Sequence, residues 1–186
     1  MEALNSDFSK SSTLSDPPTS NTHLSIHKLH KTWKLWYHLP NDNDWSLKSY
    51  KEIDNIDCIE QSIAILDIMS EDVIKYCMLF LMKEDVFPIW EDKYNRNGGC
   101  FSYKVSNKYV KETWRDLGFL LMGESISQDK EFVSSVSGIS ISPKKNFCII
   151  KIWLSTCDFQ NAKLISTELK YLNPVGCLFK KHVPEY

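Results

Sequence analysis

Glycine is scarce in this 186-residue chain, and its six glycines form neither a G-x-G-x-x-G pattern nor a Walker phosphate-binding loop. The chain also lacks the G-x-S-x-G turn that exposes a nucleophilic serine. Glu91 and Asp92 are neighbours, so in extended backbone their carboxylates point to opposite sides and make a poor acid–base pair. These absences argue against an enzyme.

The chain also has no large excess of positive or negative charge and no long apolar run. The formal net charge is only -2, so any contact with nucleic acid must be local and short. No apolar run approaches the length of a membrane span or a secretory signal, and Glu2 in place of glycine excludes N-myristoylation. We therefore expect a soluble, monomeric, intracellular protein that makes no contact with a membrane, located in the cytoplasm, with the nucleus as an alternative.

Closely spaced cysteines are absent as well. The six cysteines form no C-x-x-C pair, which disfavours a zinc site, and the missing signal peptide disfavours a disulfide framework. We expect buried thiols, no metal and no cofactor. Residues 1–25 are rich in Ser, Thr, Asn and Pro without apolar periodicity, which predicts a disordered tail ahead of one domain over residues 26–186.

Strands and helices alternate in the pattern of apolar residues. Apolar side chains of period two predict strands, and spacings of three and four predict helices. The predicted strands cover residues 31–39, 50–53, 73–82, 101–105, 139–141, 147–153 and 174–183, with 101–105 paired to 73–82. The predicted helices carry Ile56, Ile59, Ile63 and Leu66 after an N-cap at Asp54 or Asn55, then Val110, Trp114, Leu117 and Leu121, then Ala162, Ile165, Leu169 and Leu172 after Asp158.

Single helices between pairs of strands indicate an α+β fold. We predict a curved antiparallel sheet with about three helices packed on its convex face. The concave face and the loop ends are then left free for a ligand.

Two of the six tryptophans stand apart from the others. Trp33, Trp36 and Trp114 follow the strand and helix periods and are expected in the core. Trp45 and Trp90 instead adjoin polar loop residues, which favours a role in stacking on a ligand. Glu91 beside Trp90 adds two acceptors, and a flat cation with neighbouring N–H donors, such as 7-methylguanine, satisfies both groups.

These residues carry a resemblance to a known family. The spacing Trp33-x-x-Trp36, then Trp45, then Pro88-Ile89-Trp90-Glu91-Asp92-x-x-Asn95-x-x-Gly98-Gly99, and later Trp114 and Ile152-Trp153 resembles the mRNA cap-binding translation initiation factor 4E family over roughly residues 27–182. The resemblance implies that Trp45 and Trp90 sandwich 7-methylguanine. It also implies that Glu91 accepts from the guanine edge, and that Trp153 touches the N7-methyl group.

The phosphate side of the implied site departs from the family pattern. Lys144 matches a family cation that holds the cap triphosphate, whereas the next family lysine aligns with Asn146, and Lys145 is its neighbour. Lys180 is a further candidate. Because other family cations align with Ile149 and Cys100, we expect weaker phosphate contacts here and a shallower dependence on salt.

The partner face implied by the family is altered too. The family grips an amphipathic helix of the scaffold factor 4G or of repressors, and His27, Leu29, Ile56 and Gly123 keep compatible residue types. A key family Trp aligns with Glu60, a family leucine with Arg115, and another leucine with Phe119. Losing an aromatic anchor removes the kind of residue that dominates binding energy.

Two binding functions therefore remain open. The chain is either an initiation factor that recruits capped mRNA to a scaffold, or a cap-binding competitor or mRNA-selective variant without ordinary scaffold recruitment. A pure protein-interaction module is disfavoured, since Trp45, Trp90, Glu91 and Trp153 are all present.

Overall fold

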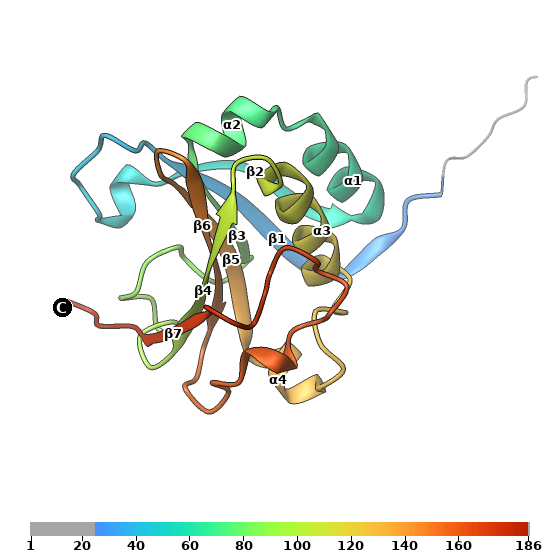
Figure 1. Cartoon of the computed structure of the whole chain (residues 1–186). Helices are drawn as coiled ribbons and strands as arrows, with labels where there is room; N and C mark the ends of the chain where they lie inside the picture. The colour runs from blue at the N-terminus through green and yellow to red at the C-terminus, as the bar shows by residue number, and fades with distance from the viewer. Residues whose placement is uncertain (1–24, 186) are drawn as a thin grey trace, which may run out of the picture.

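The seven strands within residues 25–185, the part that this computed structural model describes, form one antiparallel sheet in the order β2-β1-β3-β5-β6-β4-β7 (Figure 1). The α+β class and the curved antiparallel sheet are confirmed. The predicted tail over residues 1–25 lies, apart from Ser25, outside the described residues. The strands are β1 (Lys28–His38), β2 (Lys51–Cys58), β3 (Met78–Lys83), β4 (Gly99–Ser106), β5 (Val136–Pro143), β6 (Phe147–Leu154) and β7 (Leu178–Lys181).

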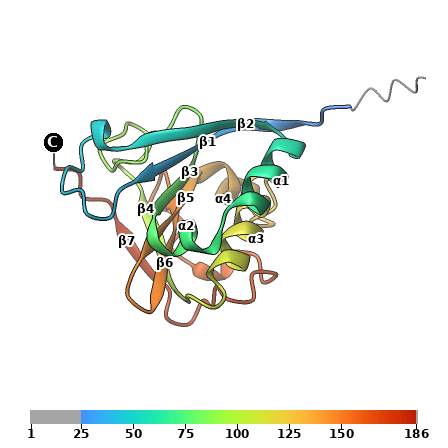
Figure 2. The same ribbon diagram turned by 90° about the horizontal axis from the view of Figure 1, so that it is seen from above.

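Four α-helices, rather than about three, occur in the described part of the chain. They are α1 (Ile59–Ile68), α2 (Glu71–Tyr76), α3 (Val110–Met122) and α4 (Lys130–Ser135), with 3-10 turns at Leu47–Ser49 and Ala162–Leu164. Helices α1, α2 and α3 gather on one side of the sheet (Figure 2). None of the helices between residues 25 and 185 is long and apolar enough to span a bilayer.

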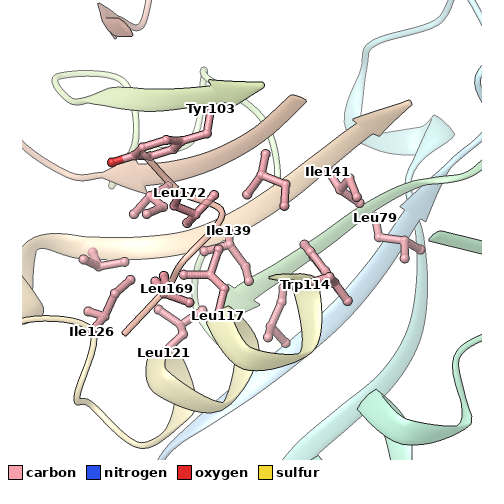
Figure 3. Packing of buried hydrophobic residues seen from close by; sticks show 14 of the residues in the cluster. Leu79, Tyr103, Trp114, Leu117, Leu121, Ile126, Ile139, Ile141, Leu169 and Leu172 are labelled. Atoms are coloured by element: carbon pink, nitrogen blue, oxygen red, sulfur yellow. The ribbon is translucent and has the colours of Figure 1, made fainter. Parts of the chain in front are cut away.

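The main core lies between α3 and the sheet. Trp114, Leu117 and Leu121 recur every three or four residues along α3 and meet apolar side chains of the sheet such as Ile139 and Ile141 (Figure 3). All five are at most 3% exposed. The predicted core position of Trp114 is therefore confirmed, and Trp33, also 1% exposed, lies in the same cluster.

A second, smaller cluster covers the opposite face of the sheet. Because side chains alternate along a strand, Leu35 faces the main core while its neighbour Trp36 faces the other way. Trp36 is buried, as predicted, but in this second cluster. Its buried members are Trp36, Tyr50, Phe80, Met82, Val86 and Trp153.

The segment 73–82, predicted as one strand, is instead a helix followed by a strand. The Ser70 hydroxyl caps α2 by accepting from the Val73 N–H at 3.2 Å, and acidic Glu71 and Asp72 favour the positive end of the helix. Strand β3 begins only at Met78. The predicted pairing of 101–105 with this segment is also wrong, because β4 pairs with β6 and β7, whereas β3 pairs with β1 and β5.

Two predicted helix positions need correction. Strand β2 continues through Cys58, so α1 begins at Ile59 and neither Asp54 nor Asn55 is its N-cap. Residues 162–172 contain only a short 3-10 turn, although Ile165, Leu169 and Leu172 are buried.

Helix α4 was missed by the periodicity because it has only six residues. Its signal is the cap: the Asp129 carboxylate accepts from the backbone N–H groups of Glu131 and Phe132 at 2.9 and 3.1 Å. The hairpin of β5 and β6, helix α3 and the last strand were predicted correctly in kind.

Candidate functional site

A cavity of about 600 Å³ opens on the sheet face away from α3. Its floor comes from β3, β5 and β6, and its walls come from two loops. We call residues 41–46, between β1 and β2, the Trp45 loop, and residues 84–98, between β3 and β4, the Trp90 loop. The lining residues are Asn43, Asp44, Trp45, Ser46, Tyr50, Met78, Phe80, Pro88, Ile89, Trp90, Glu91, Ser140, Ser142, Lys151, Trp153 and Glu185.

The Trp45 loop is shaped by local hydrogen bonds. The Asp42 carboxylate accepts from the Asp44 N–H at 2.9 Å, and the Asp44 carboxylate accepts from the Ser46 N–H at 2.8 Å, which lowers the pKa of Asp44. Trp45 is 53% exposed, as its polar surroundings predicted. Its indole stacks on the His38 imidazole, with the centroids 4.4 Å apart and the planes at 5°.

The Trp90 loop is held by a buried amide. The Asn95 side chain is fully buried and donates to the backbone carbonyls of Phe87 and Ile89, both at 2.9 Å. These bonds close the loop on either side of Pro88. The half-buried Trp90 indole is stacked on the His182 ring at 5.7 Å and 14°.

The glycine pair fixes where the Trp90 loop rejoins the sheet. A Cβ atom on Gly98 would lie 1.8 Å from the Leu154 carbonyl oxygen, so only glycine allows this backbone approach. Gly99 then begins β4 against β7. The loop is thus tied to the sheet and to the carboxyl-terminal strand.

The four predicted guanine-binding residues line one cavity. Trp45 and Trp90 come from the two walls, Glu91 adjoins Trp90, and Trp153 lies on the floor. Trp153 is 3% exposed, and its indole N–H donates to the Ser140 hydroxyl at 2.9 Å, which fixes the ring plane. Their meeting in one place is what the sequence predicted.

Glu91 makes a contact that the sequence did not predict. Its carboxylate accepts from the Glu185 backbone N–H at 3.1 Å, and Glu185 itself lines the cavity. The carboxyl-terminal residues therefore form part of the wall.

The predicted phosphate-binding lysines are divided. None of the three is among the lining residues. Lys144 and Lys145 lie between β5 and β6, whereas the Lys180 amine lies 5.8 Å from the centre of the Trp90 ring. Lys151, which was not predicted, lines the cavity with its amine also 5.8 Å from that ring. The alternation of side chains along β6 could have indicated Lys151, because it lies on the same face of the strand as Trp153.

Lys151 is a cation without a carboxylate partner among the described residues, since it takes part in none of their ion pairs. Its backbone pairs with Ser102 on one side and Ser140 on the other, so hydroxyl groups flank it across the sheet. An oxygen-rich anion in the cavity would find a positive charge and hydroxyl donors together.

The predicted partner face has its charged residues occupied. The Glu60 carboxylate lies 2.6 Å from the His27 ring Nδ1 atom and accepts from the His27 backbone N–H, and hydrogen bonding to the His27 side chain lowers the pKa of Glu60 to about 2. Arg115 pairs with Asp116 at 3.1 Å. The prediction for Ile56 was wrong, because this residue is wholly buried in β2 opposite Trp33.

The other predicted partner-face residues are more accessible. Leu29 and Phe119 are half-buried against the main core. Gly123 is the exposed C-cap of α3.

A family model described as eukaryotic initiation factor 4E matches residues 28–182. The chain belongs to this family. Among curated proteins, it is 30% identical to eukaryotic translation initiation factor 4E1 of Drosophila melanogaster over 155 residues, 80% of this chain and 58% of that protein. It is 27% identical to translation initiation factor 4E of Eremothecium gossypii over 133 residues, 68% of this chain and 62% of that protein. In both cases the chain covers less than two thirds of the relative's length.

Solved structures of initiation factor 4E proteins share the fold. Ascaris suum eIF4E-3, solved with an m7G cap, is 20% identical, with a TM-score of 0.68 over 86% of this chain and 93% of that chain. Schistosome eIF4E, solved with m7GpppG and 4E-BP, is 22% identical, with a TM-score of 0.69 over 84% and 88%. At these identities the likeness establishes the architecture of the sheet and its helices.

Proposed function

We propose that this chain binds the 7-methylguanosine cap of mRNA and acts in translation initiation. The observation that carries the proposal is the convergence of two indoles, a carboxylate and a third indole on one cavity, at Trp45, Trp90, Glu91 and Trp153. Family membership supports it, as do relatives solved with cap compounds. The chain acts by binding and not by catalysis.

The stacking walls account for recognition of the methylated base. A cation over an indole gains about 2 kcal/mol once it is desolvated, and base–aromatic stacking gives about 1–3 kcal/mol per base. Methylation at N7 makes the guanine ring cationic, so the clamp of Trp45 and Trp90 favours the methylated form. Trp153 on the floor contacts the methyl group.

The edge of the base is recognised by Glu91. Its carboxylate accepts from the guanine N1–H and exocyclic amine, and the Trp90 backbone N–H donates to O6. The Glu185 N–H donates to one oxygen of this carboxylate at 3.1 Å, and a carboxylate keeps further lone pairs for the two donors of the base. Hydrogen bonds to a charged group contribute about 1.5–3 kcal/mol each, so the contact with the edge of the base is favourable.

The phosphate groups are held from the floor of the cavity. Lys151 is assigned this role because it lines the cavity without an acidic partner, and Lys180 lies at the same distance from Trp90. Lys144 and Lys145 reach a phosphate only beyond the cavity, at its β5–β6 end. The protein acts in the cytoplasm, with the nucleus as the alternative.

A second function is favoured by the altered partner face. Glu60 is held by His27 and Arg115 by Asp116, so the usual scaffold helix loses its aromatic anchor and meets two ion pairs. Such a chain acts as a cap-binding competitor or a variant selective for certain mRNAs. Capture by a peptide carrying the scaffold motif separates the two: strong capture supports recruitment, and none supports the competitor.

Ligand titration tests the primary proposal. We expect 7-methyl-GTP to quench tryptophan fluorescence at concentrations where GTP has little effect. Glu91→Ala and Trp90→Ala should abolish the response, while Glu168→Ala, an exposed glutamate remote from the cavity lining, should leave it unchanged. Equal titration by GTP and 7-methyl-GTP would show that the assignment is wrong.

A further inference from the structure

His38 is a buried polar residue placed directly behind Trp45. The imidazole is 0% exposed and parallel to the indole at 4.4 Å, while Tyr50 meets its other side at 4.8 Å and 55°. It occupies the last position of β1, three residues before the Trp45 loop begins. The ring therefore forms a rigid support at the point where the loop leaves the sheet.

The same imidazole also holds the backbone of the loop. His38 Nε2 lies 2.8 Å from the Asp44 carbonyl oxygen, and since a carbonyl only accepts, Nε2 carries the proton. Asp44 immediately precedes Trp45. One side chain thus fixes the indole plane through stacking and the adjoining peptide through a hydrogen bond.

His38 does not reach the ligand space itself. Trp45 lines the cavity and His38 does not, so the imidazole covers the indole face that points away from the cavity. Trp45 stays 53% exposed with its other face available. Any influence of His38 on a bound base passes through Trp45.

Histidine is a costly residue for this position. Its second ring nitrogen, Nδ1, is buried without a hydrogen-bond partner among the described residues, and a buried unpaired acceptor lowers stability. Phenylalanine keeps a flat aromatic ring at this position and has no buried nitrogen to leave unpaired. The hydrogen bond to Asp44 satisfies Nε2 alone and leaves Nδ1 without a partner.

We propose that His38 is a positioning residue that fixes the orientation of the Trp45 indole before the base binds. This inference rests on the proposed cap-binding function. Preorganisation raises affinity by removing the cost of ordering the loop on binding. A residue that lowers stability yet orders the binding loop follows the trade between stability and function seen at binding sites.

The test separates the hydrogen bond from the stack. His38→Phe keeps an aromatic ring and removes the bond to Asp44, while His38→Ala removes both. We expect His38→Phe to weaken 7-methyl-GTP binding about fivefold to tenfold, mainly through slower association, with an equal or higher melting temperature. His38→Ala should bind more weakly still and melt lower. His30→Phe, at a histidine that is 79% exposed and remote from this cavity, is the matched control and should bind as wild type.

Each result decides the matter. Wild-type binding by His38→Phe overturns the inference, and so does a fall in its melting temperature that parallels the loss of binding. Failure of the wild-type protein to prefer 7-methyl-GTP over GTP overturns the proposed function instead. In that case the 19F resonance of 5-fluorotryptophan at position 45 still tests whether His38 orders the indole. Without ligand, this resonance should be broader in His38→Phe than in the wild type. An unchanged line width overturns the inference.

Discussion

The two walls of the cavity present an indole in different ways. The Trp45 loop is held by short-range contacts, among Asp42, Asp44 and Ser46 and to His38 at its base. The Trp90 loop is held by the buried Asn95 amide and by contacts to distant segments. One wall depends on contacts within a few residues along the chain, whereas the other is also tied to His182, 87 residues away.

Both indoles nevertheless rest on a histidine. Trp45 lies on His38 and Trp90 lies on His182, and each imidazole donates to a backbone carbonyl of the loop that it supports, Asp44 or Asn95. Because the acceptor is a carbonyl, the histidine nitrogen is the donor in each case. The same two contacts, ring stacking and a hydrogen bond to a carbonyl, thus support the indole in both the Trp45 loop and the Trp90 loop.

The largest expected effect is on stability, and it should differ between the two walls when a residue that holds each loop is removed. Asn95→Ala loses two buried hydrogen bonds, so we expect the free energy of unfolding to fall by about 2–3 kcal/mol. The Ile89 carbonyl loses its side-chain donor, whereas the Phe87 carbonyl still accepts from the Ile89 N–H. Asp42→Ala removes one bond in an exposed turn and should cost about 0.5 kcal/mol or less. Urea unfolding of both variants gives the comparison, and equal losses would remove the distinction between the walls.

Two lysine side chains lie near the Trp90 ring, and within the described residues none lies near the Trp45 ring. The next largest expected effect, on ligand affinity, follows from this difference. Lys151→Gln should weaken 7-methyl-GTP binding by about tenfold or more, since a charge-assisted contact to phosphate contributes about 1.5–3 kcal/mol. It should change 7-methylguanosine binding less than twofold, and Lys151→Arg should restore most of the affinity. Isothermal titration with both ligands measures this.

Lys145→Gln is the control for Lys151→Gln, because Lys145 does not line the cavity. An equal loss for nucleoside and nucleotide would place Lys151 at the base or in the fold instead of at the phosphates. A loss confined to Lys145→Gln would return the phosphate contact to the β5–β6 loop.

Acid should act on the Trp90 wall through His182, and this is the smallest expected effect. Burial lowers the pKa of His182, helped by the Lys151 charge, against the opposing influences of the Asn95 carbonyl and Glu91. The folded state therefore resists protonation while the unfolded chain takes up a proton near the ordinary pKa of 6.5. Stability should be intact above that pH and decline as the pH falls below it.

Thermal melting of the wild type and of His182→Phe between pH 7.5 and 5 tests this expectation. The variant should lose less stability over the range than the wild type. Identical slopes would show that the decline comes from other groups.

The sequence predicted the site better than it predicted the connections between elements. Trp45, Trp90, Glu91 and Trp153 could be named because their family spacing is specific, and α3 because its apolar stripe is long. The register that brings β4 beside β6 and β7 could not be obtained from local pattern, because strand pairing depends on the whole sheet.

Short elements and unusual residues were the other failures. Helices α2 and α4 have six residues each, which is too few for a periodic apolar stripe. Only their capping residues, Ser70 and Asp129, indicate these helices in the sequence. Lys151 was not predicted because the family pattern points to the lysines between β5 and β6 instead. His38 was overlooked because its role depends on a contact six residues along the chain.

The hydrogen bond from the Glu185 N–H to Glu91 has a practical and a chemical consequence. A purification tag fused to the carboxyl end would sit at the mouth of the binding site, so affinities measured with such a tag would understate those of the free protein. The bond also takes up one acceptor position of the Glu91 carboxylate and leaves its second oxygen for a bound base.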